Sequence, residues 1–404
     1  MNRGRAPSGL KVPHGLSPLI LLRSLYLLRT SAIQASLIAL GLASVLISPF
    51  SFPYPMQQII YAQNLCDELD SLVAQIAPDR VFVLTDTTTQ ECCLPLLKSS
   101  VAVSNAQHIT IGSTDASKTL ESLATVWEAL GNGGGSRHSL LLCLGGGMVT
   151  DLGGFAAATF KRGIPFINIP TTLLAMVDAA VGGKTGINFN GLKNEIGVFR
   201  EAEAVIIDTQ FLRTLDAPNL RSGYAEMLKH SLLDGVEMWA THLNFELSQP
   251  DYSLLQDLVR QSIDVKRRIV AEDPTEKGIR KALNLGHTTA HAFESLALHE
   301  NRVLLHGYAV AWGLAGELYL SATKLGFPTD RMRQTVQYIN EHYGKFDFTC
   351  KQYEQLYDYM THDKKNVGGV INFTLLNNVG DICLNQHATK DELFDMFDFL
   401  REGA

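Results

Sequence analysis

A short apolar run that ends in three consecutive glycines constrains this chain more than any other feature. Leu140–Leu144 reads LLLCL without a polar position, and Gly145, Gly146 and Gly147 follow it. A strand of this kind is buried on both faces, which is typical of a parallel sheet covered by helices. Glycines between such a strand and a helix let backbone N–H groups approach a pyrophosphate. A tight turn that binds nothing explains the triplet equally well, and the pattern is not GxGxxG.

Strand and helix patterns alternate on both sides of this turn. RVFVLTDTTT begins at Arg80, HITIGS at His108 and IPFINIP at Ile164. This alternation predicts an α/β nucleotide-binding domain with a parallel sheet over residues 56–208. Segments 251–270 and 306–326 then carry apolar residues at the spacing of amphipathic helices. We therefore expect a mainly α-helical domain over residues 209–404, and 404 residues suffice for two cores.

Charge and cysteine usage limit the class of protein. The net charge of −7 argues against binding of nucleic acid, which requires a basic face to displace counterions from phosphates. Any anion site must therefore be local. The six cysteines are scattered without a CxxC pair, which is typical of reduced thiols in a cytoplasmic protein.

Residues 1–55 form an atypical extension. Basic residues are followed by an apolar run from Ala32 to Ile47, as in a signal peptide or a short membrane anchor. The run is shorter than the roughly 20 residues of a transmembrane helix, so we expect no membrane association. A true start at Met56 is the interpretation we favour, because a plausible strand follows it and the helix-breaking SPFSFPYP precedes it. A targeting segment is the next alternative, and a structured extension the last.

Polar residues gather in a stretch that we expect to be rich in loops, after the strand at Ile164. Lys184 lies in GGKTG, which is similar to a phosphate-binding P-loop, but Asp178 stands where that motif requires glycine. This excludes an ATPase of that class. An acidic residue and a lysine on glycine-rich backbone favour a polyhydroxylated anionic substrate. Further polar groups of the same stretch are Thr171, Thr172, Lys193 and Asn194.

The helical half contains a candidate metal site. Glu226, His287 and His306 are a carboxylate and two imidazoles, the open ligand set of catalytic zinc. His287 and His291 lie four residues apart on one helix face, but the glutamate of HExxH is absent between them, which argues against a zinc protease. Taken singly, each histidine is more often a packed residue than a ligand.

Positive and amide groups are scattered around these residues. Lys229 should share a helix face with Glu226, and Arg280 and Asn284 are i,i+4 neighbours that we expect to point into one pocket. The remaining candidates are Lys266, Lys364 and Lys365.

Together these motifs resemble the 3-dehydroquinate synthase family. The likeness covers about residues 80–380 and rests on GGGMVTDLGGFAAATFKRG, IPTTLLAMVDAAVGGKTGIN, LKNEIG, GYAEMLKH, LNLGHTTAHAFE, LLHGYAVAWG and HDKKN. It implies a cytoplasmic homodimer that converts 3-deoxy-D-arabino-heptulosonate 7-phosphate to 3-dehydroquinate and phosphate in the shikimate pathway. The implied route is transient oxidation by NAD, loss of phosphate, re-reduction and an intramolecular aldol closure.

The resemblance also implies roles for residues. It makes Glu226, His287 and His306 ligands of Zn²⁺ or Co²⁺, and it places around the substrate Asp178, Lys184, Lys193, Asn194, Lys229, Lys266, Arg280, Asn284, His291 and one of Lys364 and Lys365. Arg162 would reach the phosphate from the other subunit. The implied NAD contacts are Asp86, Thr88, Asp115, Lys118, Gly146, Gly147, Met148, Asp151, Thr171, Thr172, Lys184, Lys193, Phe211 and Thr214. The chain departs from the family at Asp115, where glutamate is common, at Tyr308 and at TLDAPNL.

Three alternatives remain. Another sugar-phosphate cyclase would act on a substrate without a carboxylate and would have no reason to keep Lys266 and Arg280 together. A metal-dependent polyol or glycerol-phosphate dehydrogenase would release NADH. A membrane-tethered inactive relative is disfavoured by the intact Glu226, His287, His306 and Lys184.

Overall fold

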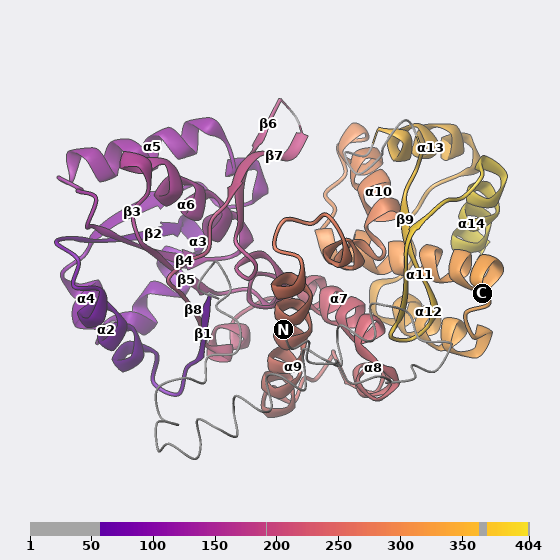
Figure 1. The fold of residues 1–404 in the computed structure, drawn as a ribbon, viewed down its shortest axis with the longest axis horizontal. Helices are drawn as coiled ribbons and strands as arrows, with labels where there is room; N and C mark the ends of the chain where they lie inside the picture. Colours follow the sequence, from indigo (N-terminus) through magenta and orange to yellow (C-terminus); the bar gives the residue numbers. More distant parts are fainter. Residues whose placement is uncertain (1–56, 191, 363–369, 403–404) are drawn as a thin grey trace, which may run out of the picture. The chain divides into compact units, whose positions relative to one another are not determined.

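The computed structural model describes residues 57–190, 192–362 and 370–402. The predictions for residues 1–55, and for Lys364 and Lys365, concern residues outside the described ranges. Figure 1 follows the chain from an α/β half to a helical half.

The α/β half is built on a six-stranded sheet in which every pairing is parallel. The strand order is β1-β8-β5-β4-β2-β3. The strands are β1 (Gln58–Tyr61), β2 (Val81–Asp86), β3 (Gln107–Ile111), β4 (Leu140–Gly145), β5 (Phe166–Pro170) and β8 (Ala204–Ile207). The strands expected after Arg80, His108 and Ile164, and the run Leu140–Leu144, are confirmed.

Helices cover both faces of this sheet. In β4, Leu141 and Cys143 pack in one hydrophobic cluster, while Leu140, Leu142 and Leu144 pack in another. The first cluster includes residues of α5 (Leu120–Asn132) and α6 (Gly147–Thr159), and the second includes residues of α2 (Leu65–Ile76). This confirms that the run is buried on both faces. Shorter helical segments complete the half: α3 (Thr87–Cys92), η1 (Leu94–Leu97), α4 (Val101–Ser104), η2 (Asp115–Ser117) and η3 (Phe160–Arg162).

The stretch after β5 is more regular than the sequence suggested. Thr171 and Thr172 follow the strand directly, but Asp178 lies in a π-helical turn, η4 (Ala175–Ala179). Lys184 begins β6 (Lys184–Phe189), which pairs with β7 (Leu192–Phe199) as an antiparallel hairpin. The prediction of a loop-rich stretch was wrong here because the glycines of GGKTG lead into a hairpin whose partner strand lies further along the chain.

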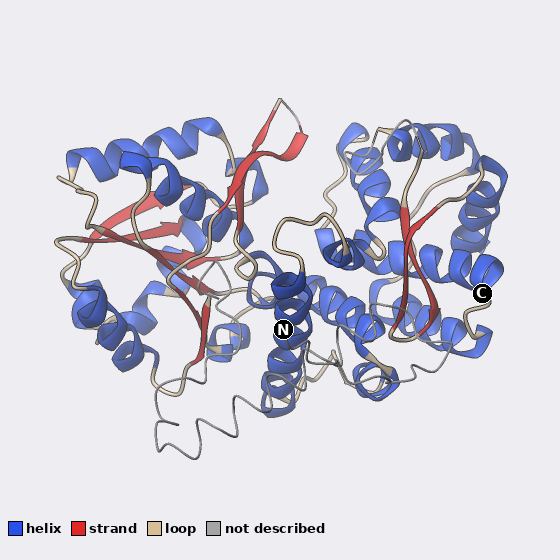
Figure 2. Ribbon diagram, viewed as in Figure 1, coloured by secondary structure: helices blue, strands red, loops and turns tan. Residues whose placement is uncertain are grey.

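The second half is mainly helical, as predicted, and its described residues also include a small two-stranded sheet (Figure 2). That sheet is the antiparallel pair β9 (Phe373–Asn378) and β10 (Asp381–Gln386). The helical segments are η5 (Thr209–Arg213), α7 (Ala217–Asp234), α8 (Val236–Leu243), α9 (Tyr252–Glu272), η6 (Ile279–Asn284), α10 (His287–His299), α11 (His306–Leu325), α12 (Thr329–Tyr343), η7 (Cys350–Gln352), α13 (Tyr353–Thr361) and α14 (Lys390–Glu402). The exact boundary at 208/209 stays a prediction.

The two helices expected to be amphipathic differ in the structure. Helix α9 has a buried stripe and an exposed face, as its pattern predicts. Helix α11 is buried over most of its length, including the polar Glu317 and Ser321, so the amphipathic interpretation was wrong for it. It contacts α7, α10, α12, α14 and β9, and its exposed residue Thr323 lies near its C-terminal end.

Two further findings bear on the class of protein. The six cysteines are all free, as expected. Among the helices of the described residues, none combines the length and apolar character needed to cross a membrane.

Candidate active site

The three expected metal ligands come together from three helices. Glu226 lies within α7, while His287 and His306 are the first residues of α10 and α11. The Nε2 atoms of His287 and His306 lie 3.4 and 3.3 Å from Oε1 of Glu226. The ligand atoms of the three residues all lie within 4.8 Å of one another. Residues up to 80 positions apart in the sequence, from Glu226 to His306, therefore share one small volume.

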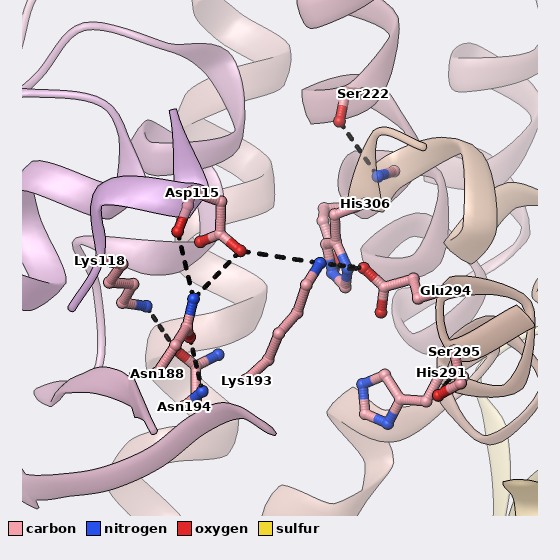
Figure 3. Close-up of polar contacts among 12 residues, drawn as sticks. Asp115, Lys118, Asn188, Lys193, Asn194, Ser222, His291, Glu294, Ser295 and His306 are labelled. Atoms are coloured by element: carbon pink, nitrogen blue, oxygen red, sulfur yellow. Dashed lines mark hydrogen bonds and ion pairs between the residues drawn. The ribbon is translucent and has the colours of Figure 1, made fainter. Parts of the chain in front are cut away.

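Close packing of α11 on α7 creates this arrangement. The backbone N–H of Gly307 donates to Oγ of Ser222 over 3.0 Å, a contact drawn in Figure 3. A Cβ at position 307 would lie 1.8 Å from the carbonyl oxygen of Ser222, so only glycine permits the approach. This close approach of the two helices places His306, the residue before Gly307, beside the carboxylate of Glu226.

These residues fit a divalent metal. Glu226 is fully buried and also pairs with the buried Lys229 of its own helix, so the two share a face as expected. Burial alone would raise the pKa of Glu226, but Lys229 and His287 outweigh it and hold that pKa well below the usual range. Both histidines present Nε2 to the carboxylate, while Nδ1 of His287 lies 3.1 Å from the carbonyl of Leu285. A carboxylate and two imidazoles oriented through their second nitrogens suit zinc or cobalt.

A partly buried ion pair joins the α/β half to this centre. Nζ of Lys266, on α9, lies 2.5 Å from Oδ1 of Asp178 and 2.6 Å from its carbonyl oxygen. Burial alone would raise the pKa of Asp178, but Lys266 outweighs it and keeps the carboxyl ionised. Asp178, Glu226 and His230 also bring their ligand atoms within 4.8 Å of one another. Nδ1 of His230 lies 2.7 Å from Oγ of Ser262.

Arg280 and Asn284 occupy one region but not one α-helix face. They lie in the 3₁₀ segment η6, so the i,i+4 argument was wrong in its geometry. Arg280 is buried and donates to the carbonyl oxygens of Gly182 and Pro274 over 2.9 and 2.7 Å. Asn284 donates to Oε1 of Glu276 over 3.0 Å, and Lys184 pairs with the other oxygen of that carboxylate.

The expected nucleotide contacts lie at the carboxyl edge of the parallel sheet. Asp86 ends β2 and caps α3, Gly146 follows β4 and caps α6, and Thr171 follows β5. The connections of β2 and β4 leave these neighbouring strands in opposite directions, since β3 lies beyond β2 and β5 beyond β4. Such a switch point is where open α/β sheets bind ligands.

The other expected cofactor residues lie close by or further along. Gly147 and Met148 are the first two residues of α6, and Asp151 lies one turn further along that helix. Thr88 is exposed on α3. Phe211 lies in η5, and Thr214 is the residue directly after η5. Lys118 is buried and pairs with Asp151 over 2.5 Å and with Asn194 of the hairpin. Asp115 accepts a hydrogen bond from Asn188 over 3.4 Å.

Figure 3 shows how the hairpin meets the helical half. Nζ of Lys193, on β7, lies 2.9 Å from Oε1 of Glu294 on α10 and 3.8 Å from Oδ2 of Asp115. His291 lies one turn after His287 on the same helix, with ring centroids 5.7 Å apart. The side chains of Lys193 and Glu294 therefore link the two halves directly.

Arg162 lies elsewhere. It lines a surface recess with Ser136, Arg137, His138 and Lys161. Its φ of 69° and that of Lys161, 49°, put two consecutive residues in the left-handed region. The structure therefore does not place Arg162 among the residues around Glu226.

The residues that the sequence reasoning missed are carboxylates and one histidine. Glu294 lies seven positions after His287 and three after His291, so helical periodicity could have found it. His230 lies four positions after Glu226 on α7, so the same periodicity could have found it. Glu276 gave no comparable signal, because its partner Lys184 lies on a distant segment.

The fold and the donor set define a class: an α/β nucleotide-binding half joined to a helical half with a carboxylate and two imidazoles suited to a metal. Family models for the 3-dehydroquinate synthase N-terminal and C-terminal domains match residues 108–222 and 223–366. A 3-dehydroquinate synthase of Parabacteroides distasonis is 54% identical over 347 residues, which cover 86% of this chain and 98% of that protein. The chain belongs to the 3-dehydroquinate synthase family.

Solved structures give the same fold. A 2-epi-5-epi-valiolone synthase from Streptomyces hygroscopicus with NAD⁺ and Zn²⁺ bound is similar with a TM-score of 0.73 at 25% identity, covering 88% of this chain and 99% of that one. A 2-deoxy-scyllo-inosose synthase complexed with carbaglucose-6-phosphate, NAD⁺ and Co²⁺ also gives 0.73, at 21% identity, covering 86% and 96%. At 21% identity, the similarity to the 2-deoxy-scyllo-inosose synthase shows the fold alone.

Proposed function

We propose that this chain converts 3-deoxy-D-arabino-heptulosonate 7-phosphate to 3-dehydroquinate and phosphate, using NAD and a zinc or cobalt ion. The observation that carries the proposal is the cluster of Glu226, His287 and His306 beside buried cations. Lys229 and Lys266 lie in the same buried region, and Arg280 is nearby. A simple polyol gives no reason to bury so much positive charge, whereas a substrate with a carboxylate and a phosphate does.

When bound, the metal would polarise substrate hydroxyl oxygens and the nicotinamide would exchange a hydride with the substrate. Glu226, His287 and His306 would hold the metal, and the turn at Gly146 and Gly147 would face the pyrophosphate of the nucleotide.

The chain's own side chains bind and orient the substrate. Asp178 stays ionised and can accept a hydrogen bond from a substrate hydroxyl, while Lys266, Arg280 and Asn284 present donors to its anionic groups. Lys184, Lys193, Asn194 and Lys229 surround the same space in this proposal. His291 would donate a proton at a phosphate oxygen as that group leaves. The carbocycle then closes within the site.

The proposal is tested by assaying purified protein for phosphate release from the heptulosonate phosphate while following absorbance of NADH. Phosphate and 3-dehydroquinate should form in equal amounts without accumulation of NADH. Net NADH production would indicate a dehydrogenase instead. Turnover of a sugar phosphate without a carboxylate, and none of the heptulosonate phosphate, would indicate another cyclase.

We further propose a cytoplasmic homodimer in which Arg162 serves the site of the other subunit. Its position beside Arg137 and His138, at a surface recess, supports this arrangement. Mixing inactive Arg162→Ala and Glu226→Ala subunits tests it, because a heterodimer would contain one complete site. Random pairing should restore about a quarter of wild-type activity. An inactive mixture of exchanged subunits would show that Arg162 acts within its own chain.

A further inference from the structure

One oxygen of Glu294 contacts two different parts of the site. Oε1 lies 3.3 Å from Nδ1 of His306 and 2.9 Å from Nζ of Lys193. His306 belongs to the metal cluster in the helical half, and Lys193 lies on the β6–β7 hairpin of the α/β half. Figure 3 shows Lys193 reaching from the hairpin side toward the Glu294 carboxylate, close to the His306 ring.

The contact with His306 decides which ring nitrogen would be available to a metal. A carboxylate accepts a hydrogen bond, so Nδ1 of His306 carries the proton that it donates to Glu294. In the neutral imidazole, which is the form that binds a metal, the lone pair is then on Nε2, the atom that lies 3.3 Å from Oε1 of Glu226. Such a carboxylate behind an imidazole fixes both the orientation of the ring and its tautomer.

The contact with Lys193 is different in kind. The Glu294 side chain is 9% exposed and the Lys193 side chain 47% exposed. Hairpin residues around Lys193 are exposed along the whole of β7. Lys193 is therefore the exposed partner of a largely buried acceptor, and Glu294 is the nearer of the two carboxylates that hold its ammonium, with Asp115 3.8 Å away.

A surface ion pair would not have these properties. Glu294 lies on the face of α10 that carries His287 and His291, and both of its partners belong to the proposed site. Exposed ion pairs contribute little to stability, whereas the Glu294 side chain is largely buried and its Oε1 also contacts the His306 imidazole. The location on α10 ties the carboxylate to the helix that also supplies His287.

We propose that Glu294 is a positioning residue: it orients His306 for the metal and holds Lys193 at the substrate site. This inference rests on the proposed function. Its two parts are separable, because removing Lys193 leaves the contact between Glu294 and His306 intact.

Metal affinity of the metal-free protein tests the first part, measured with Zn²⁺ against a chromophoric chelator. Glu294→Ala should weaken binding roughly 10–100-fold, the usual effect of losing such a partner. Glu294→Gln preserves size and an accepting oxygen and should fall between Glu294→Ala and wild type. The control is Glu300→Gln at the end of the same helix, whose carboxylate pairs with Arg302, and it should bind as wild type does.

The kinetic constants test the second part. Lys193→Met should leave the metal affinity unchanged and raise KM, because the lysine acts on the substrate and not on His306. Glu294→Gln should raise KM as well, since the neutral amide holds the ammonium less firmly.

The inference fails if Glu294→Ala binds Zn²⁺ as tightly as wild type, or if Glu300→Gln weakens binding as much as Glu294→Ala. It also fails if Lys193→Met weakens metal binding as much as Glu294→Ala. Failure of the proposed function is distinguishable, because wild-type protein would then bind no metal or release no phosphate.

Discussion

The two halves of the molecule build their parts of the site in opposite ways. In the α/β half, the proposed nucleotide contacts depend on backbone at the strand ends, where Gly146 caps α6 and leaves its N–H groups accessible. In the helical half, the proposed contacts are buried ionised side chains such as Glu226 and Lys229. Burying charge is costly unless it is paired, whereas a glycine turn costs little. The helical half therefore carries the more specific information about function.

The largest expected effect comes from removing the central carboxylate. Glu226→Ala should abolish metal retention and leave the buried Lys229 without its partner, a change that costs about 3–5 kcal/mol of stability. Elemental analysis of the purified variant and denaturant unfolding measure the two effects. Metal retained at the wild-type ratio would exclude Glu226 as a ligand.

Acid should act on the helical half through His242. This residue is buried in α8, with Nδ1 2.8 Å from the carbonyl of Met238, and burial lowers its pKa from 6.5 to about 4. As the pH falls, His242 takes up a proton in the unfolded chain before it does so in the folded protein. Its contribution to the free energy of unfolding is therefore fully present above pH 6.5 and is lost as the pH falls toward 4. The full loss is about 3 kcal/mol. His242→Gln should flatten this part of the profile in urea unfolding at pH 7 and pH 4.5, and an unchanged slope would refute the assignment.

His291→Ala separates chemistry from cofactor binding. If His291 acts at the leaving phosphate, kcat should fall about 100-fold, while the Kd for NAD changes much less. Steady-state kinetics measure kcat. Quenching of the protein's tryptophan fluorescence on titration with NAD measures the Kd. An unchanged kcat would remove His291 from the mechanism.

The smallest effect is expected in the α/β half. A Cβ at Gly146 would lie 3.1 Å from Cγ2 of Thr172, so Gly146→Ala crowds the turn. The Kd for NAD should rise about tenfold, the equivalent of 1.4 kcal/mol, with Zn²⁺ affinity unchanged. Weaker metal binding in this variant would contradict the assignment of this turn to the nucleotide alone.

Local patterns predicted the parallel sheet and the helical half. The metal cluster of Glu226, His287 and His306 was predicted from its ligand types together with the family resemblance, because its members are far apart in the sequence. The uniformly apolar Leu140–Leu144 leaves one structural solution, and His287 with His291 gives a recognisable helical spacing. Long-range pairings were not predictable: Lys184 meets Glu276 across 92 positions, and Lys193 meets Glu294 across 101. Periodicity reports which face of a helix is apolar, but not that neighbours surround it, and so the burial of α11 was missed.

The central claim is that a metal held by Glu226, His287 and His306 is required for turnover of the heptulosonate phosphate. Protein stripped by a chelator, with metal content checked by elemental analysis, should release phosphate only at the background rate. One equivalent of Zn²⁺ or Co²⁺ should restore activity in wild type but not in Glu226→Ala. Full phosphate release by verified metal-free protein would contradict the account.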